Sequence, residues 1–193
     1  DCCVGKMVVS IELTRDLIAR QHRAKFVATG QTGILIAGDG CPIDCVVSDF
    51  ISGAVEKQIL ANQEHDILCI EGQGSLAHPR YSAVTLGLLH GSIPHGMVLC
   101  YEAGRKTVHG MPDIDLASLA VLKAAYESAA NLMMPSQIIG IAMNSRLLSA
   151  EAAEEERNRV RDEFQLPVCD VFRHGPAELS EAVLKLKQRI QRR

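Results

Sequence analysis

A chain of 193 residues with 47% hydrophobic and 22% charged residues has the length and balance of a soluble globular protein with one sizeable core. Its net charge of −3, its few aromatic residues and its lack of tryptophan give no reason to expect nucleic acid or an anionic membrane as a partner. No apolar run approaches the roughly 20 residues that a membrane-spanning helix needs. We therefore expect one globular domain over residues 1–193.

The seven cysteines do not predict a disulfide framework or a zinc site, because their number is odd and no Cys-x-x-Cys pair occurs. Three of them lie in apolar strand-like runs, where a cysteine is usually a small buried hydrophobe: Cys69, Cys100 and Cys169. A reducing, cytoplasmic setting is the simplest interpretation.

Helix-like and strand-like patterns alternate along the chain. Apolar residues at helical spacing predict helices at 6–21, 46–62, 116–133, after an N-cap at Ser149, and from Pro176 onward. Short apolar runs predict strands at 25–29, 66–71, 97–101, 137–143 and 167–172. Such strands between helices indicate a mainly parallel sheet covered on both faces, so the expected fold is α/β, a three-layer sandwich. Ligands of these sheets bind at the carboxyl ends of the strands.

The start of the chain has the pattern of a phosphate-binding loop: Asp1-Cys2-Cys3-Val4-Gly5-Lys6-Met7. Gly-Lys stands directly before an amphipathic helix, whose N-terminal amides and dipole favour phosphate oxygens, and Lys6 would neutralise them. The alternative is a plain turn with a chance Gly-Lys. Met7 stands where P-loop enzymes have a Ser or Thr that binds Mg²⁺. A thioether does not suit that cation, so any metal is held elsewhere, or the loop binds phosphate without hydrolysing it.

A second candidate site follows the strand at 66–71 and spans Glu71-Gly-Gln-Gly-Ser-Leu-Ala-His-Pro at 71–79. A carboxylate at the tip of a buried strand can hold Mg²⁺ or act as a base, so Glu71 is a candidate for both roles. His78 is the best histidine candidate because of its neighbours, and Gln73 and Ser75 are candidate substrate contacts. The alternative is a glycine-rich turn in which Glu71 caps a helix.

Three further places offer polar side chains. Thr29, Gln31 and Thr32 lie in a glycine-flanked stretch that suits a small polar substrate, or that forms a simple hairpin-like turn. Arg105 suits bidentate binding of a carboxylate, although a surface charge is the ordinary alternative. Asp49 is a candidate metal ligand, with an exposed acid on a helix as its default interpretation.

The chain resembles, first, the dethiobiotin synthetase-like branch of P-loop proteins. The shared features are Asp-x-x-Val-Gly-Lys at 1–6, Glu-Gly-x-Gly at 71–74 and a late apolar strand that ends in Asn144. This resemblance implies that Lys6 contacts phosphate, that Glu71 and Asp49 lie in a Mg²⁺ site, and that Asn144 reads a nucleotide base. It also implies a homo-oligomer, because many proteins of this branch dimerise. Met7 departs from that branch's Thr.

A closer resemblance covers nearly the whole chain. Residues 26–38, 47–54, 71–79 and 84–91 are similar to the C-terminal P-loop domain of the D-glutamate N-acetyltransferase-like family. Members of that family commonly carry Met after Gly-Lys, so Met7 is then expected. They also have an N-terminal Rossmann-like domain of comparable size. The resemblance therefore implies a leading strand and a whole domain upstream of Asp1.

The expected activity is N-acetyl transfer from acetyl-CoA to an amino acid such as D-glutamate, in an enzyme whose loop grips the phosphates of the cofactor. Lys6, Glu71 and His78 are then the expected catalytic residues. Thr29, Gln31, Thr32, Gln73, Ser75 or Arg105 would orient the acceptor. Two alternatives remain open: an ATP- and Mg²⁺-dependent ligase or kinase, and a nucleotide-binding regulatory domain without turnover.

Overall fold

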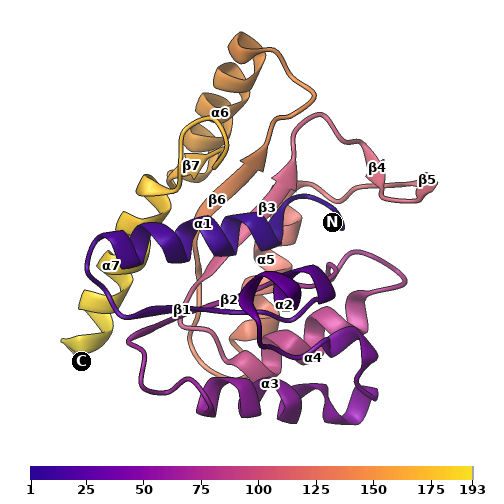
Figure 1. The fold of residues 1–193 in the computed structure, drawn as a ribbon. Coiled ribbons are helices and arrows are strands. Elements are labelled where there is room, and N and C mark those ends of the chain that lie inside the picture. The colour runs from indigo at the N-terminus through magenta and orange to yellow at the C-terminus, as the bar shows by residue number, and fades with distance from the viewer. Residues whose placement is uncertain (193) are drawn as a thin grey trace.

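The computed structural model describes residues 1–192, which form seven α-helices, two short 3-10 helices and seven strands (Figure 1). The α-helices are α1 (Lys6–Ala19), α2 (Gln31–Ala37), α3 (Ile51–Leu60), α4 (Ser82–Ser92), α5 (Leu119–Ala130), α6 (Ala150–Phe164) and α7 (Ala177–Gln191). The 3-10 helices are η1 (Ile43–Cys45) and η2 (Ser48–Phe50). The strands are β1 (Ala24–Val27), β2 (Ile67–Ile70), β3 (Met97–Glu102), β4 (Thr107–Val108), β5 (Met111–Asp115), β6 (Ile138–Asn144) and β7 (Val168–Cys169).

The main strands are parallel, as their apolar sequences predict, but they form two separate groups. β1 pairs with β2, with Phe26 opposite Cys69. β3 pairs with β6, which also pairs with β7, so that the order is β3-β6-β7. A small antiparallel hairpin of β4 and β5 projects from the end of β3 (Figure 1).

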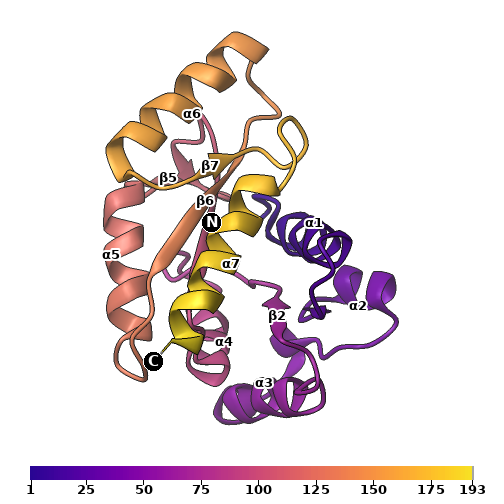
Figure 2. The ribbon, with the colours of Figure 1, turned by 90° about the vertical axis from the view of Figure 1, so that its left-hand side faces the viewer.

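Helices cover both faces of the strands (Figure 2). On one face, α1 and α7 pack their apolar stripes on β1, β2, β6 and β7, with Leu17 and Leu179 fully buried between them. On the other face, α5 and α6 pack on β3 and β6 through Leu122 and Val160. A third cluster joins α3 and α4 beneath the end of β2. This is the three-layer α/β arrangement that the alternating pattern predicts.

Several predicted boundaries shift. The stretch after β1 was expected to be a glycine-bent loop, but Gln31 begins helix α2, because an apolar run follows it and a buried carboxylate contacts the amides before it. The helix expected at 46–62 starts as η2 and becomes α-helical at Ile51. The helix expected at 116–133 spans only Leu119–Ala130, because Ser118 caps it. The last strand is only two residues long.

Helix α4 and the β4–β5 hairpin were not predicted. The sequence of α4 is almost uniformly apolar, with two internal glycines, so it shows no helical periodicity. Its glycines instead allow close packing, since a Cβ on Gly91 would lie 2.7 Å from the backbone of Ser52 in α3. The predicted N-cap is confirmed: the Ser149 hydroxyl accepts a hydrogen bond from the Ala152 amide.

All seven cysteines are free thiols, and of the three in strands Cys69 and Cys169 are buried whereas Cys100 is partly exposed. Within residues 1–192, no helix combines the length and the apolar character that crossing a bilayer requires.

Candidate phosphate-binding and acyl-transfer site

The loop that precedes α1 presents free backbone amides. Gly5 is the N-cap of α1 and has a φ of 99°, a left-handed conformation that favours glycine. The first helical hydrogen bond runs from the Val9 amide to the Gly5 carbonyl, so the amides of Lys6, Met7 and Val8 have no acceptor inside the helix. No side chain caps this end and no acidic residue lies in the first turn. The end of α1 is therefore free to receive an anion.

Lys6 adds a positive charge at the same place. Its ammonium group folds back over the loop and donates a 2.7 Å hydrogen bond to the Asp1 carbonyl. Burial lowers the pKa of Lys6, because few groups nearby replace the water that would solvate its charge. Among residues 1–192, no carboxylate forms an ion pair with it. An anionic ligand would supply the missing counter-charge.

Arg105, after β3, fastens the loop to the end of the sheet. Its guanidinium donates hydrogen bonds to the Asp1 carboxylate at 2.8 Å and to the Cys2 carbonyl at 2.7 Å. It also forms an ion pair with Glu102 at 3.0 Å, and its side chain is only 11% exposed. Arg105 is thus already paired with two carboxylates. We assign it to holding the loop, and its predicted contact with an acceptor carboxylate plays no part in the function proposed below.

Glu71, at the end of β2, contacts the start of α2. Its Oε2 atom accepts hydrogen bonds from the amides of Thr29 at 3.0 Å and Gly30 at 3.1 Å. The Thr29 hydroxyl donates to the Glu71 carbonyl, and Gln73 donates to that hydroxyl. A Cβ on Gly33 would lie 2.4 Å from Oε2, so glycine is needed for this approach. One carboxylate oxygen of Glu71 is therefore held by the helix start, while Oε1 accepts no hydrogen bond within residues 1–192.

The sequence-predicted substrate residues divide into two groups here. Thr29 and Ser75 are buried beside Glu71 and His78, and the Ser75 hydroxyl accepts a hydrogen bond from the Ala77 amide. Gln31 and Thr32 are exposed in the first turn of α2. Gln31 and Thr32 therefore face solvent, whereas Gln73 and Ser75 line the cavity that reaches Lys6.

His78 is buried and fully engaged. Its Nδ1 accepts a hydrogen bond from the Arg80 amide at 3.2 Å, and its Nε2 lies 3.1 Å from the His109 carbonyl. These two partners require the neutral ring with its proton on Nε2. Its ring also packs against Tyr81, with centroids 4.5 Å apart. His78 is therefore placed to fix the turn after β2, rather than to take a proton from a substrate.

The residues near the loop do not suit Mg²⁺. Within residues 1–192, the group of side chains close enough to share an ion consists of Asp1, Cys2 and His78. A thiol is a poor ligand for a hard cation, and the other two side chains already have hydrogen-bond partners. Asp49 lies exposed in η2 and is not in this group.

Asn144 ends β6 beside the loop, as predicted. Its Nδ2 lies 3.5 Å from the Val4 carbonyl, and its Oδ1 accepts from the Arg146 amide. The next residue belongs to a buried pair that the sequence did not reveal: the Ser145 amide and hydroxyl both donate to Asp170, at 2.9 and 2.6 Å. The position of Asp170 directly after an apolar strand is the signal that could have indicated it.

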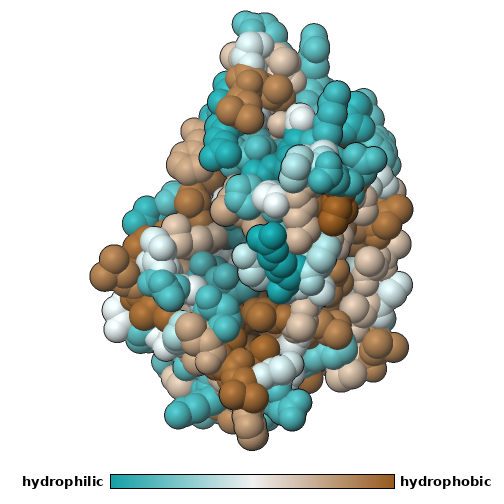
Figure 3. Space-filling view, turned by 90° about the vertical axis from the view of Figure 1, so that its right-hand side faces the viewer, coloured by the Kyte–Doolittle hydropathy of each residue, from teal (hydrophilic) through white to brown (hydrophobic). Residues whose placement is uncertain are grey.

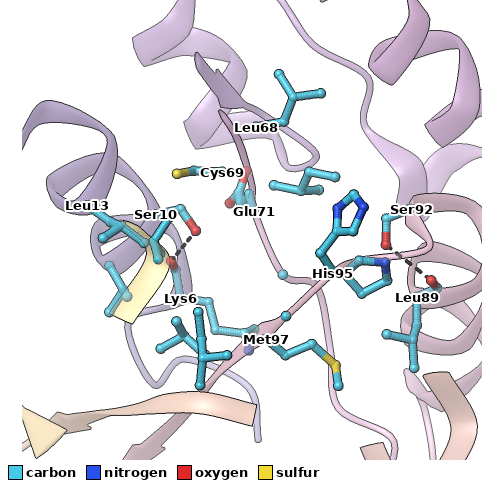
Figure 4. A pocket seen from close by; sticks show the side chains of 18 of the residues that line it. Lys6, Ser10, Leu13, Leu68, Cys69, Glu71, Leu89, Ser92, His95 and Met97 are labelled. Atoms are coloured by element: carbon cyan, nitrogen blue, oxygen red, sulfur yellow. Dashed lines mark hydrogen bonds between the residues drawn. The ribbon is translucent and has the colours of Figure 1, made fainter. Parts of the chain in front are cut away.

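A cavity of about 630 Å³ connects these groups. Lys6 and the turn at 71–75 lie at one end, and apolar side chains of β2, β3, α1 and α7 line the rest. Figure 4 shows Lys6, Leu68, Glu71 and Met97 around the same hollow. The face that carries the N-terminus and the β4–β5 hairpin mixes hydrophilic residues at its centre with hydrophobic residues below them (Figure 3).

The comparisons with known proteins agree with this geometry. Residues 1–180 match the family described as "Domain of unknown function (DUF1611_C) P-loop domain". The chain belongs to the DUF1611 family. A crystal structure of a DUF1611 family protein from Anabaena variabilis ATCC 29413 superposes with a TM-score of 0.91 at 39% identity, and the match covers 95% of this chain and 54% of that one.

Two similar proteins carry the name D-glutamate N-acetyltransferase. The protein from Tritonibacter scottomollicae is 40% identical over 184 residues, which is 95% of this DUF1611 chain and 55% of that protein. The protein from Pseudoalteromonas sp is 40% identical over 176 residues, which is 91% of this chain and 53% of that protein. The chain thus spans about half the length of the relatives that it matches. The resemblance to the D-glutamate N-acetyltransferase-like family is confirmed, and both of these relatives are named as transferases.

Proposed function

We propose that this domain grips the phosphates of acetyl-CoA in an enzyme that transfers the acetyl group to the amine of an amino acid such as D-glutamate. The observation that carries the proposal is the uncapped start of α1 next to Lys6, a half-buried cation without a carboxylate partner among residues 1–192. Coenzyme A bears a nucleotide with several phosphates, which supply the charge that Lys6 lacks. The names of the two relatives support the same reaction.

The proposed loop works without Mg²⁺. Met7 offers no hydroxyl in the first turn of α1, and Glu71 gives one carboxylate oxygen to the amides of Thr29 and Gly30. The positive groups that remain are Lys6 and the helix amides, which bind phosphate oxygens directly. This argues for a loop that holds its ligand rather than one that cleaves a phosphoanhydride.

The transfer needs a base, because an ammonium group is not a nucleophile. In the proposed reaction the neutral acceptor amine attacks the thioester carbonyl and passes a proton to the protein. The bond to sulfur breaks, and the leaving thiolate takes up that proton, so that coenzyme A is released as a thiol. Glu71 is the proposed base, since it lines the cavity and its Oε1 accepts no hydrogen bond within residues 1–192. His78 is the weaker candidate because both of its ring nitrogens are already bonded.

Two further assignments complete the proposal. Gln31 and Thr32, exposed in the first turn of α2, would contact the acceptor near Glu71. Asn144, next to the Val4 carbonyl, would contact the adenine of the cofactor. Thr29, Gln73 and Ser75 would hold the ligand-binding residues in position, through the hydrogen bonds that fix the turns after β1 and β2.

Calorimetry on the full-length protein tests the proposal. Acetyl-CoA, ATP and GTP are titrated with and without Mg²⁺, and acetylated product is then measured with D-glutamate as acceptor. We expect acetyl-CoA to bind without metal, and Lys6→Ala to weaken it at least tenfold while the far-ultraviolet circular dichroism stays unchanged. Lys57→Ala, at an exposed lysine of α3, is the matched control and should bind normally.

Three results would contradict the proposal. Equal acetyl-CoA affinity in Lys6→Ala would remove the phosphate assignment. Binding of ATP that requires Mg²⁺, followed by ADP formation, would indicate a ligase or kinase instead. Nucleotide binding with dimerisation and no product from any acceptor would indicate a regulatory domain.

A further inference from the structure

Three side chains with different donor atoms meet at the phosphate-binding loop. Asp1 offers a carboxylate oxygen, Cys2 a thiol sulfur and His78 a ring nitrogen, and one such atom of each lies within 4.8 Å of the other two. They come from two segments, the loop before α1 and the turn after β2. The fold, rather than a local sequence motif, therefore brings the three donors together.

The loop gives its two neighbouring cysteines different surroundings. Cys3 has a φ of 55°, a left-handed conformation that is uncommon for a residue other than glycine. Cys3 is exposed, whereas Cys2 is partly buried and lies near His78. The side chains of Asp1 and His78 are at most 4% exposed. Solvent therefore reaches this group of donors from the side of Cys2.

The turn between β4 and β5 orients the other two side chains. The His109 amide donates a 3.0 Å hydrogen bond to the Asp1 carboxylate, and the His109 carbonyl lies 3.1 Å from Nε2 of His78. Arg105 donates to the same carboxylate at 2.8 Å. Imidazole and carboxylate ligands of metals are characteristically held by hydrogen bonds of this kind. The group thus has the outer contacts of a metal site as well as the donors.

These contacts leave room for a cation. A carboxylate can accept about four hydrogen bonds. Within residues 1–192 that of Asp1 accepts three, from Arg105 and from the amides of Cys2 and His109. The ring of His78 must give up one of its two contacts to bind a metal. A single neutral hydrogen bond contributes little beside a bond from metal to nitrogen.

We propose that Asp1, Cys2 and His78 form a zinc site, which joins the phosphate-binding loop to the turn after β2. Sulfur, imidazole nitrogen and carboxylate oxygen are the ligand atoms of zinc in proteins, whereas Mg²⁺ takes oxygen. Zinc bonds to these atoms are about 2.0 to 2.3 Å long, so two ligands of a tetrahedral ion lie about 3.5 Å apart. The three side chains need only small rotations to reach that spacing.

The charges of the site balance. The thiol releases its proton to solvent when the metal binds, so Cys2 and Asp1 together bring two negative charges to one Zn²⁺. The complex therefore adds no net charge beside Lys6, whose ammonium group bonds to the Asp1 carbonyl. Three protein ligands leave the fourth position of the ion to water. Zinc and the proposed acetyl-CoA can then occupy the protein independently.

Titration of the metal-free, reduced full-length protein with Co²⁺ tests the proposal. Co²⁺ accepts the same nitrogen, sulfur and oxygen ligands as zinc, and its bond to a thiolate gives a strong near-ultraviolet absorption. We expect this absorption to saturate at one ion per chain, to disappear when Zn²⁺ is added and to persist in excess Mg²⁺. No acetyl-CoA is present, so the result does not depend on the proposed acetyl transfer.

Variants assign the ligands. Cys2→Ser should abolish the absorption, and Asp1→Asn and His78→Gln should each weaken Co²⁺ binding at least tenfold. Cys3→Ser is the matched control, since this neighbouring thiol is exposed and is not one of the three donors. It should keep both the absorption and the affinity of the parent. Far-ultraviolet circular dichroism checks that each variant is folded.

Two results would overturn the proposal. The first is the absence of a thiolate absorption from the parent protein at saturating Co²⁺. The second is an absorption that Cys2→Ser retains, because the metal would then bind another thiol, such as exposed Cys3 or Cys45.

Discussion

Arg105 and Asp1 are joined by a 2.8 Å hydrogen bond between guanidinium and carboxylate, with both side chains at most 11% exposed. This pair ties the first residue of the phosphate-binding loop to the turn after β3. The His109 amide donates to the same carboxylate, so the β4–β5 hairpin is attached to the loop as well. The loop is thus held from the sheet end that also carries Glu102 and Asn144.

Replacing Arg105 should destabilise the protein through this pair. Arg105→Ala leaves the buried carboxylate of Asp1 without its arginine and leaves Glu102 with only Arg146, and breaking a buried pair typically costs about 3 to 5 kcal/mol. Arg146→Ala is the matched control, since Arg146 also pairs with Glu102 but is 59% exposed, and exposed pairs contribute about 1 kcal/mol or less. Urea unfolding measures the loss of stability in both variants. If Arg105→Ala lost no more stability than Arg146→Ala, the loop would not depend on Arg105.

Replacing Glu71 should affect the start of α2 as well as the reaction. Glu71→Ala leaves the amides of Thr29 and Gly30 buried without an acceptor, which costs about 2 to 4 kcal/mol in the free energy of unfolding. Glu71→Gln keeps an acceptor oxygen but is not a base, so it should lose less stability and still lose most of the acetylation rate. Denaturant titration and product formation are measured on the same preparations.

The two Glu71 variants separate the two roles of the side chain. If Glu71→Gln retained full acetylation, the carboxylate would be a structural cap only. If Glu71→Ala were as stable as the parent, the observed contacts with Thr29 and Gly30 would not be energetically important.

The sequence predicted those parts of the fold whose pattern is local. The strand that ends in Asn144 and the helix that begins after Ser149 lie where apolar runs and a capping residue indicate. Helix α2 was missed because its start depends on Glu71, 40 residues later in the chain. Helix α4 was missed because its largely apolar sequence shows no helical periodicity.

In the candidate site, too, only the features with a local sequence pattern were predictable. The phosphate loop was predictable because Gly5 and Lys6 are adjacent in sequence and precede a helix. The engagement of Arg105 with Asp1 and of His78 with Arg80 and His109 was not predictable, because each depends on how the turns after two strands pack together. Residue type alone made both side chains resemble free catalytic groups.

Lowering the pH should destabilise the turn between β6 and α6, because Asp170 becomes protonated. Burial opposes ionisation of this carboxyl, but hydrogen bonds from Ser145, Phe172 and Arg173 outweigh it and lower its pKa below the ordinary 3.8. A group with a lowered pKa stabilises the fold above 3.8, and that contribution is lost as the pH falls through the lowered value. The free energy of unfolding of Asp170→Asn should therefore be about 2 kcal/mol lower than that of the parent at pH 7. It should also fall less steeply as the pH is lowered.

Denaturant titrations from pH 7 to pH 2.5 check this result. Asp162→Asn, at an exposed acid of α6, should keep the parent's acid profile. An unchanged acid profile in Asp170→Asn would show that the contacts with Ser145 do not couple to folding.

Raising the pH should lower the free energy of unfolding, because the buried thiol of Cys169 in β7 resists ionisation in the folded protein. Burial raises the pKa of Cys169 from 9.0 to about 12, because a thiolate cannot be solvated between β6 and α7. A raised pKa means that the stabilising contribution is complete below pH 9 and is lost as the pH rises toward 12, since only the unfolded chain releases the proton in that range. The free energy of unfolding should fall by up to about 1.4 kcal/mol per pH unit from this group.

Cys169→Ala should therefore show a shallower decline of this free energy between pH 9 and pH 10.5, although it is less stable at pH 7. Cys45→Ala, at an exposed thiol, should keep the parent's slope, and identical slopes in all three proteins would contradict the burial of a neutral thiol at position 169.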